Sequence, residues 1–343
     1  MINMIQRSKL IPFMFILLFF LAITTVNAAQ IDDTGNNTQL SHKSSEVVTA
    51  VISQPDIKVD ENIKMQKNIK KEQTRNVSSF DELYDTIEDI KTNSNETSQT
   101  INLNAGNYNI TKTINWGNTT HTTKTLTING NNIKVDGQRQ YQFMSISNNY
   151  TLNIYNIILE NCSGSVFKSS GNLTIINSNF KNNNATSGGV VYNEGFLVLR
   201  NSNLTDNHAT NSGASIYNKA NASITNTLFK DNTAKTAAGV YNDGGMTNII
   251  DSNFISNIAD NGGALLNSNN GTMNIIQLYF FDNNATVDGG VLYNKIGNLN
   301  IIHSNFTNNN AKNKASVVYN SGSLLVDGCI LSDNYDKENS SIV

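Results

Sequence analysis

This sequence of 343 residues has few cysteines and few charged residues. Its two cysteines, Cys162 and Cys329, fall in the first and last copies of a repeat, and seven coils at ~4.8 Å each would hold them ~34 Å apart, beyond the reach of a disulfide. Charged residues make up 15% of the chain and acids outnumber bases by 27 to 24, which argues against wholesale nucleic-acid binding. No nucleophile elbow, phosphate-binding loop or HExxH motif is present.

Residues 1–28 have the features of a secretory signal peptide. Arg7 and Lys9 precede an apolar run over residues 10–23, and small residues that suit cleavage follow it. The run is shorter than the ~20 residues of a spanning helix, which favours a cleaved signal over an uncleaved anchor, and no later stretch is apolar enough to cross a membrane. We therefore expect a mature chain that works outside the cytoplasm.

Residues 29–77 are polar and of mixed charge, and they predict a low-complexity spacer. Its lysine-rich run over residues 64–71 predicts a solvated linker, with contact to an anionic wall polymer as the alternative. A helix is then expected over residues 79–91, because Ser79 and Glu82 form a capping box and Phe80, Leu83, Ile87 and Ile90 share one face. Such a helix would cover the open first coil of a domain over residues 78–343.

One large apolar residue recurs along the chain at spacings of 24, 25, 25, 26, 26 and 25 residues. A period in this range is the signature of a solenoid, in which each repeat buries its apolar face only against its neighbours. The seven regular anchors are Phe180, Leu204, Phe229, Phe254, Phe280, Phe306 and Leu331.

Each copy repeats further columns around its anchor. An aliphatic residue stands five positions before the anchor, as Ile175 does, and a small residue stands two before it, as Ser178 does. A Gly pair or small residues, an apolar residue and Tyr-Asn close the copy, as in residues 188–193. The pattern predicts two or three short strands per coil in an all-β parallel solenoid, with irregular coils over residues 100–170 and regular coils of ~25 residues over 171–335.

An asparagine stands three residues after each regular anchor. Stacked at the strand spacing, such side chains can exchange amide hydrogen bonds from coil to coil and satisfy the backbone of the bend. We therefore predict a structural ladder formed by Asn183, Asn207, Asn232, Asn257, Asn283, Asn309 and Asn334.

The pairing of Phe-x-x-Asn, as in Phe180 to Asn183, with Gly-Gly-Ala/Val, as in residues 262–264, resembles the repeat of the polymorphic outer-membrane protein family. It is also similar to the adhesin-like surface proteins of methanogenic archaea, and the segment INLNAGNY at residues 101–108 resembles the opening coils of pectin-lyase-like β-helices. The resemblance covers about residues 80–343. It implies a right-handed single-stranded parallel β-helix and cell-surface adhesion.

A polysaccharide lyase or hydrolase is the competing hypothesis. Asp206 and Asp231 precede ladder asparagines on successive coils, where paired carboxylates could hold Ca²⁺ or perform acid–base catalysis. A lyase also needs a base, and Arg200 lies on a different side of the coil, which leaves Lys230 as the nearer candidate. Solvated surface carboxylates are the simpler interpretation, so we predict no catalytic residue and no cofactor, with Ca²⁺ at Asp206 and Asp231 as the alternative.

The sequence as a whole predicts a secreted, non-enzymatic adhesin-like protein at the cell surface. Its expected partners are an extracellular polysaccharide or a surface protein of another cell, with no nucleic acid. A purely structural envelope component is a third hypothesis. No capping helix follows Leu331, which indicates an uncovered last coil. Either the chain is a truncated relative of a longer adhesin, or another molecule covers that edge, with self-association as one form of this contact.

Overall fold

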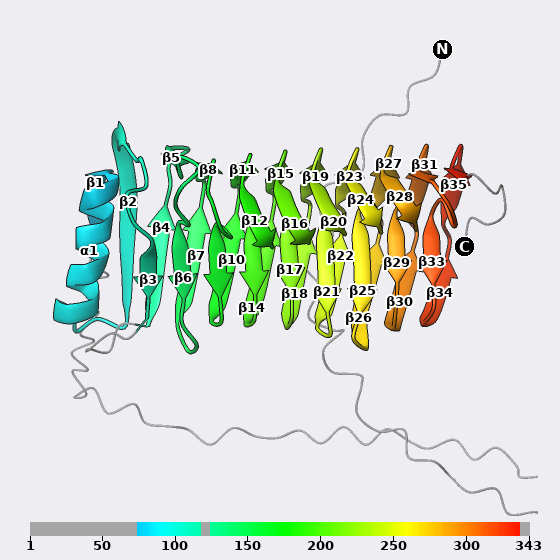
Figure 1. The fold of residues 1–343 in the computed structure, drawn as a ribbon. Coiled ribbons are helices and arrows are strands. Elements are labelled where there is room, and N and C mark those ends of the chain that lie inside the picture. The colour runs from blue at the N-terminus through cyan, green and yellow to red at the C-terminus, as the bar shows by residue number, and fades with distance from the viewer. Residues whose placement is uncertain (1–73, 118–123, 337–343) are drawn as a thin grey trace, which may run out of the picture. The chain divides into compact units, whose positions relative to one another are not determined.

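The structure, a computed structural model, describes residues 74–117 and 124–336. The predicted signal peptide and most of the predicted spacer lie outside these residues. In the described part, short strands stack in register into four parallel sheets that form a β-solenoid (Figure 1). The all-β parallel solenoid predicted from the repeat is therefore confirmed.

Within residues 74–117 and 124–336, sheet 1 contains eleven strands and sheet 2 contains nine. The strands of sheet 1 are β1 (Thr74–Ser79), β2 (Ser98–Asn107), β4 (Thr125–Asn129), β7 (Thr151–Tyr155), β10 (Asn172–Ile176), β14 (Phe196–Arg200), β18 (Asn221–Thr225), β22 (Met246–Ile250), β26 (Gly271–Ile276), β30 (Gly297–Ile302) and β34 (Ser323–Asp327). Those of sheet 2 are β5 (Lys134–Asp136), β8 (Ile158–Glu160), β11 (Asn179–Lys181), β15 (Asn203–Thr205), β19 (Leu228–Lys230), β23 (Asn253–Ile255), β27 (Tyr279–Phe281), β31 (Asn305–Thr307) and β35 (Ile330–Ser332).

In the same described part of the chain, sheet 3 contains seven strands and sheet 4 contains nine. The strands of sheet 3 are β12 (Asn184–Ser187), β16 (His208–Ser212), β20 (Thr233–Thr236), β24 (Ile258–Asn261), β28 (Asn284–Asp288), β32 (Asn310–Ala311) and β36 (Tyr335–Asp336). Those of sheet 4 are β3 (Ile114–Trp116), β6 (Met144–Ile146), β9 (Phe167–Ser169), β13 (Val191–Asn193), β17 (Ile216–Asn218), β21 (Val240–Asp243), β25 (Leu265–Ser268), β29 (Leu292–Asn294) and β33 (Val318–Asn320).

The core is built from alternate residues of each strand, whose side chains point into the solenoid. In β10, Leu173 and Ile175 are buried, whereas Thr174 between them is only partly covered. The anchor residues stack on one another inside, with the Phe229 and Phe254 rings 4.5 Å apart and the Phe280 and Phe306 rings 4.8 Å apart. These distances match the spacing of neighbouring strands, so each coil buries its aromatic ring against the next.

Regular coils contain four strands, and the predicted two or three are therefore too few. The strand that the sequence analysis did not predict belongs to sheet 3. In β12, for example, the only buried inward residue is Ala185. A strand with one small inward residue and polar outward residues carries little of the apolar alternation from which strands are predicted. In the coils expected to be irregular over 100–170, β4 pairs in register with β7 and β7 with β10 in sheet 1, whereas sheet 3 begins only at β12 among the described residues.

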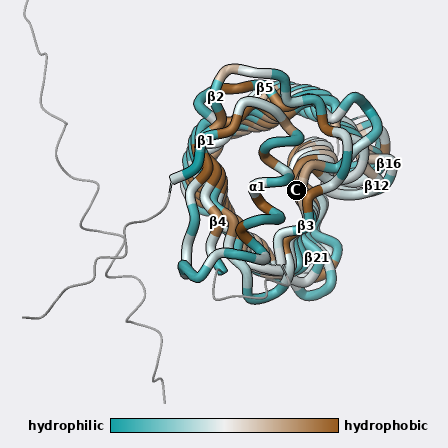
Figure 2. The backbone as a smooth tube through the Cα atoms, turned by 90° about the vertical axis from the view of Figure 1, so that its left-hand side faces the viewer, coloured by the Kyte–Doolittle hydropathy of each residue, from teal (hydrophilic) through white to brown (hydrophobic). Residues whose placement is uncertain are grey.

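The described chain begins with β1, which pairs in parallel with β2 from Thr74, four residues before the predicted start of the domain. Helix α1 (Phe80–Asn93) follows, with Ser79 as its N-cap and with Phe80, Leu83, Ile87 and Ile90 buried as predicted. The Glu82 carboxylate accepts from the amide of Ser78, one residue earlier than a capping box requires. Figures 1 and 2 show α1 across the N-terminal end of the solenoid, beside β1 and β2.

The described residues contain no helix with the length and hydropathy of a membrane span.

Candidate functional site

The predicted asparagine ladder lies at the corner between sheets 2 and 3. Each Nδ2 donates to the Oδ1 of the next coil, from Asn183 to Asn207 at 3.0 Å through to Asn309 to Asn334 at 2.9 Å. The same Oδ1 atoms accept backbone amides, and each Nδ2 also donates to a backbone carbonyl, as Asn257 does to Phe229. Every polar atom of these buried amides is thus used inside the protein, which assigns the ladder to structure and not to ligand binding.

A second asparagine ladder closes each coil after sheet 4, and the sequence analysis missed it. Asn193 donates to Asn218 at 2.7 Å, and the chain of amide contacts continues to Asn320. The signal was present in the repeated Tyr-Asn pair, which we interpreted only as the end of an apolar strand. The members of this ladder are Asn193, Asn218, Asn242, Asn267, Asn294 and Asn320.

The candidate Ca²⁺ ligands Asp206 and Asp231 stand at a tight corner of successive coils. Their backbones are left-handed, with φ of 55° and 54°, and asparagine, aspartate or serine fills this position in the other regular coils. Asn and Asp tolerate this conformation better than most residues, so the backbone alone accounts for these residue types. Both side chains are about two-fifths exposed. The Asp206 carboxylate lies 3.7 Å from the Lys181 ammonium, and the Asp231 carboxylate lies 3.6 Å from the Lys230 ammonium. Within residues 74–117 and 124–336, no group of three or more His, Cys, Asp or Glu residues is placed to hold a metal ion.

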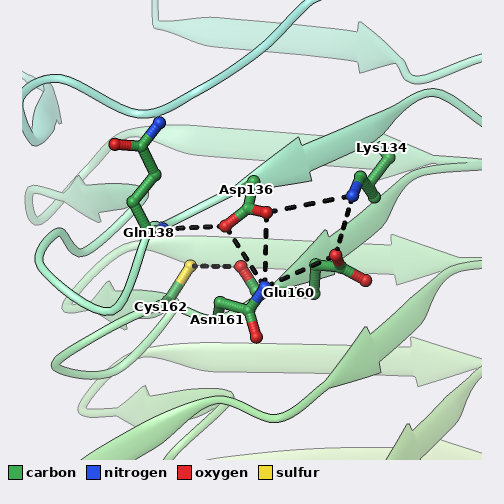
Figure 3. A network of polar contacts seen from close by, with 6 residues as sticks. All are labelled: Lys134, Asp136, Gln138, Glu160, Asn161 and Cys162. Atoms are coloured by element: carbon green, nitrogen blue, oxygen red, sulfur yellow. Dashed lines mark hydrogen bonds and ion pairs between the residues drawn. The ribbon is translucent and has the colours of Figure 1, made fainter.

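A denser group of ionisable side chains lies on sheet 2, two coils nearer the N terminus (Figure 3). The Lys134 ammonium is 3.8 Å from Asp136 and 3.0 Å from Glu160, and these contacts, above all the hydrogen bond to Glu160, raise the pKa of Lys134. Asn161 donates to both oxygens of Asp136. Lys134 and Glu160 are 26 positions apart in the sequence and meet because β5 and β8 are neighbouring strands. A local sequence motif therefore could not predict the group.

Beside this group, Cys162 occupies the place of a ladder asparagine, and its backbone amide donates to Asn183. Burial raises the pKa of its thiol to about 12, which makes it a packed and unreactive group. Cys162 and Cys329 are both free thiols, as their separation in the repeat predicts.

Tyrosines form an outward column on sheet 4. The Tyr192 and Tyr217 rings lie 5.0 Å apart and the Tyr217 and Tyr241 rings 5.1 Å apart, all nearly parallel. Burial, together with the hydrogen bond that its hydroxyl donates to Asp243, raises the pKa of Tyr217. Because these rings cover one another's faces, the column presents mainly ring edges and hydroxyls on its outer side.

A groove of about 430 Å³ crosses sheet 3 over β28, β32 and β36. It is lined by Asn284, Ala285, Thr286, Asn310, Ala311, Lys312 and Tyr335, and the hydroxyl of Thr286 donates to Asp260 at 2.6 Å. Asn310 donates to Asn284 at 2.9 Å, and Lys312 forms no ion pair with another residue of the described chain. A volume of this size with a few polar groups and one aromatic ring is within the range of small-ligand sites.

Comparison with known proteins gives no significant match to a protein-family model, a curated protein or a solved structure.

Proposed function

We propose that this protein is a secreted, adhesin-like surface protein that holds an extended polysaccharide, or a surface protein of another cell, along the outside of its solenoid. The observation that carries the proposal is the groove on sheet 3, in which the same outward position recurs on β28, β32 and β36. The Asn284 amide repeats as that of Asn310 at one strand spacing, with Tyr335 at the same position of the next coil and with Thr286 and Lys312 beside them. Polar groups spread over successive coils suit an elongated ligand, and a polysaccharide is such a ligand.

The proposal includes the finer features implied by the family resemblance, which are right-handed winding, a cleaved signal peptide and a place at the cell surface. The winding hand would follow from an experimental structure. The export signal would follow from the N-terminal sequence of the protein recovered outside the cells that produce it.

The test is a binding assay with acidic and neutral polysaccharides, with the unbound polymer analysed for new chain ends. Asn310→Ala removes a groove amide and the hydrogen bond to Asn284, and we expect it to weaken binding at least severalfold. The matched control is Asn274→Ala, which removes an amide from the outer face of sheet 1. Equal binding by the wild-type protein and both variants would remove the groove from the proposal.

A polysaccharide lyase or hydrolase is the second candidate, because the structure brings two carboxylates and an amine together at Asp136, Glu160 and Lys134. General acid–base chemistry requires such a set within hydrogen-bonding reach of one substrate. If this group is catalytic, polymer cleavage occurs and Asp136→Asn abolishes it. A structural envelope component, the third hypothesis, predicts no saturable binding of any polymer.

A further inference from the structure

Strand β27 carries two aromatic side chains on the outer face of sheet 2. The rings of Tyr279 and Phe281 are nearly parallel, at 10°, with their centres 6.0 Å apart. Tyr279 is 36% exposed and Phe281 is partly exposed, whereas Phe280 between them is fully buried in the core. The wider separation of these rings, 6.0 Å against 5.0 Å in the Tyr192–Tyr217 pair, and their partial exposure leave one apolar patch on the solvent side of the sheet, which we call the platform.

The fold does not require aromatic residues at these two positions. Tyr279 is in register with Asn253 on one side and Asn305 on the other, and Thr307 is the neighbour of Phe281 on β31. Strands β23 and β31 hold their own buried anchors, Phe254 and Phe306, without an aromatic residue outside, although Phe281 also has the apolar Ile255 as its neighbour on β23. Aromatic rings that packing does not demand point to contact with another molecule.

The size of the platform selects its occupant. Three strands at ~4.8 Å and two outward residues per strand at ~7 Å cover on the order of 100 Å², far below the ~800 Å² that each partner of a stable protein interface buries. One or two sugar rings match this area. The C–H face of a pyranose is apolar and can lie on aromatic rings while its hydroxyls reach the surrounding polar groups.

The charges around the platform select a neutral sugar. Outward residues of β23, β27 and β31 carry no charge, and the corner after β27 holds Asp282. Ser256 and Asn308 each donate to one carboxylate oxygen of Asp282, which leaves lone pairs able to accept from sugar hydroxyls. A second carboxylate, Asp251, lies at the corner before β23, so an anionic sugar would meet like charge on both sides.

We propose that Tyr279 and Phe281 form a stacking subsite for a neutral pyranose of the bound polysaccharide, with Asn253, Asn305 and Asp282 as its hydrogen-bonding rim. This inference rests on the proposed function. The platform and the sheet 3 groove are separated by a single corner, since Phe281 and Asn284 flank Asp282 and Asn283. One extended chain can reach both places.

The test measures binding of a soluble neutral glucan and of polygalacturonate to the purified chain and to the single variants Tyr279→Asn and Phe281→Thr. Each variant installs a residue already present at the same place on β31, so the fold is retained. The control is Phe196→Asn, because Phe196, 45% exposed, is flanked in register by Asn172 and Asn221. Circular dichroism and thermal unfolding verify the fold of each variant.

We expect each platform variant to bind the neutral glucan about tenfold more weakly, with the control unchanged. Neutral glucan binding that survives both platform variants but is lost in Asn310→Ala would overturn the subsite and leave the proposed function intact. Tighter wild-type binding to polygalacturonate than to the neutral glucan would overturn the choice of a neutral sugar. Absence of binding to any polymer would refute both the subsite and the polysaccharide partner of the proposed function, and would favour a protein partner or a structural role.

Discussion

The asparagine ladder predicts a large and specific loss of stability when one inner member is removed. Asn257 lies in the middle of the ladder and its side chain is fully buried. Its Nδ2 donates to Phe229 at 3.0 Å and to Asn283 at 2.9 Å, and its Oδ1 accepts from the amide and side chain of Asn232 at 3.2 and 2.9 Å. Asn257→Ala removes all four of these hydrogen bonds.

The magnitude follows from these contacts. At about 1 kcal/mol net for each hydrogen bond, the four bonds contribute about 4 kcal/mol to the free energy of unfolding. The buried amide of Asn232 loses its Oδ1 partner, whereas Asn283 still accepts from the Asn257 backbone at 3.1 Å. With a denaturant dependence of about 1–3 kcal/mol per molar urea, the midpoint of unfolding falls by about 1 M or more.

Urea unfolding followed by far-ultraviolet circular dichroism measures this change. The matched control is Asn274→Ala on the outer face of β26, where one amide contact of 2.7 Å is lost to each neighbouring coil. Water can replace those partly exposed contacts, so the control costs less than about 1 kcal/mol. Equal midpoints for Asn257→Ala and Asn274→Ala would refute the stabilising role of the inner ladder.

Three further predictions concern other parts of the solenoid. Asp231→Asn keeps a residue that tolerates the left-handed corner and changes stability by less than about 0.5 kcal/mol, whereas Asp231→Val costs about 1–2 kcal/mol; equal thermal midpoints would contradict this. Burial raises the pKa of Cys162 to about 12, so its thiol stays protonated at pH 8 and out of reach of a reagent. A thiol reagent therefore labels Cys329 alone until the protein unfolds, and labelling of both thiols in the native protein would show that Cys162 is accessible. In the last described coil Val326 is 43% exposed, whereas Ile301 of the same column is 1% exposed. Val326→Asp therefore reduces the predicted self-association in sedimentation experiments. Identical concentration dependence of the sedimentation coefficient for wild type and variant would place any association elsewhere.

Features fixed by local spacing could be predicted from the sequence. The period of the anchors identifies the solenoid, and the seven asparagines of the inner ladder stand at the predicted corner because the same offset recurs in each copy. The apolar face of α1 was predictable for the same reason, since its four buried residues follow helical spacing within one segment.

Features that arise between coils were harder to predict. Lys134 and Glu160 meet because β5 and β8 are neighbours, and the repeat is weakest in this early region. The third sheet was missed because its strands have only small inward residues, such as Ala185 and Ala209. Asp206 and Asp231 were noticed as a chemical pair, whereas their left-handed backbone gives a conformational reason for the residue type.

The central claim is that the outer surface of the solenoid binds a polysaccharide without cleaving it. The most direct measurement is equilibrium binding of the purified chain to a panel of neutral and acidic polysaccharides, followed by analysis of each polymer for new chain ends. The account predicts saturable binding of an uncharged polymer that Tyr279→Asn and Asn310→Ala each weaken, with no new chain ends. New chain ends that disappear in Asp136→Asn would instead make the protein an enzyme, and the absence of saturable binding to every polymer would contradict the account.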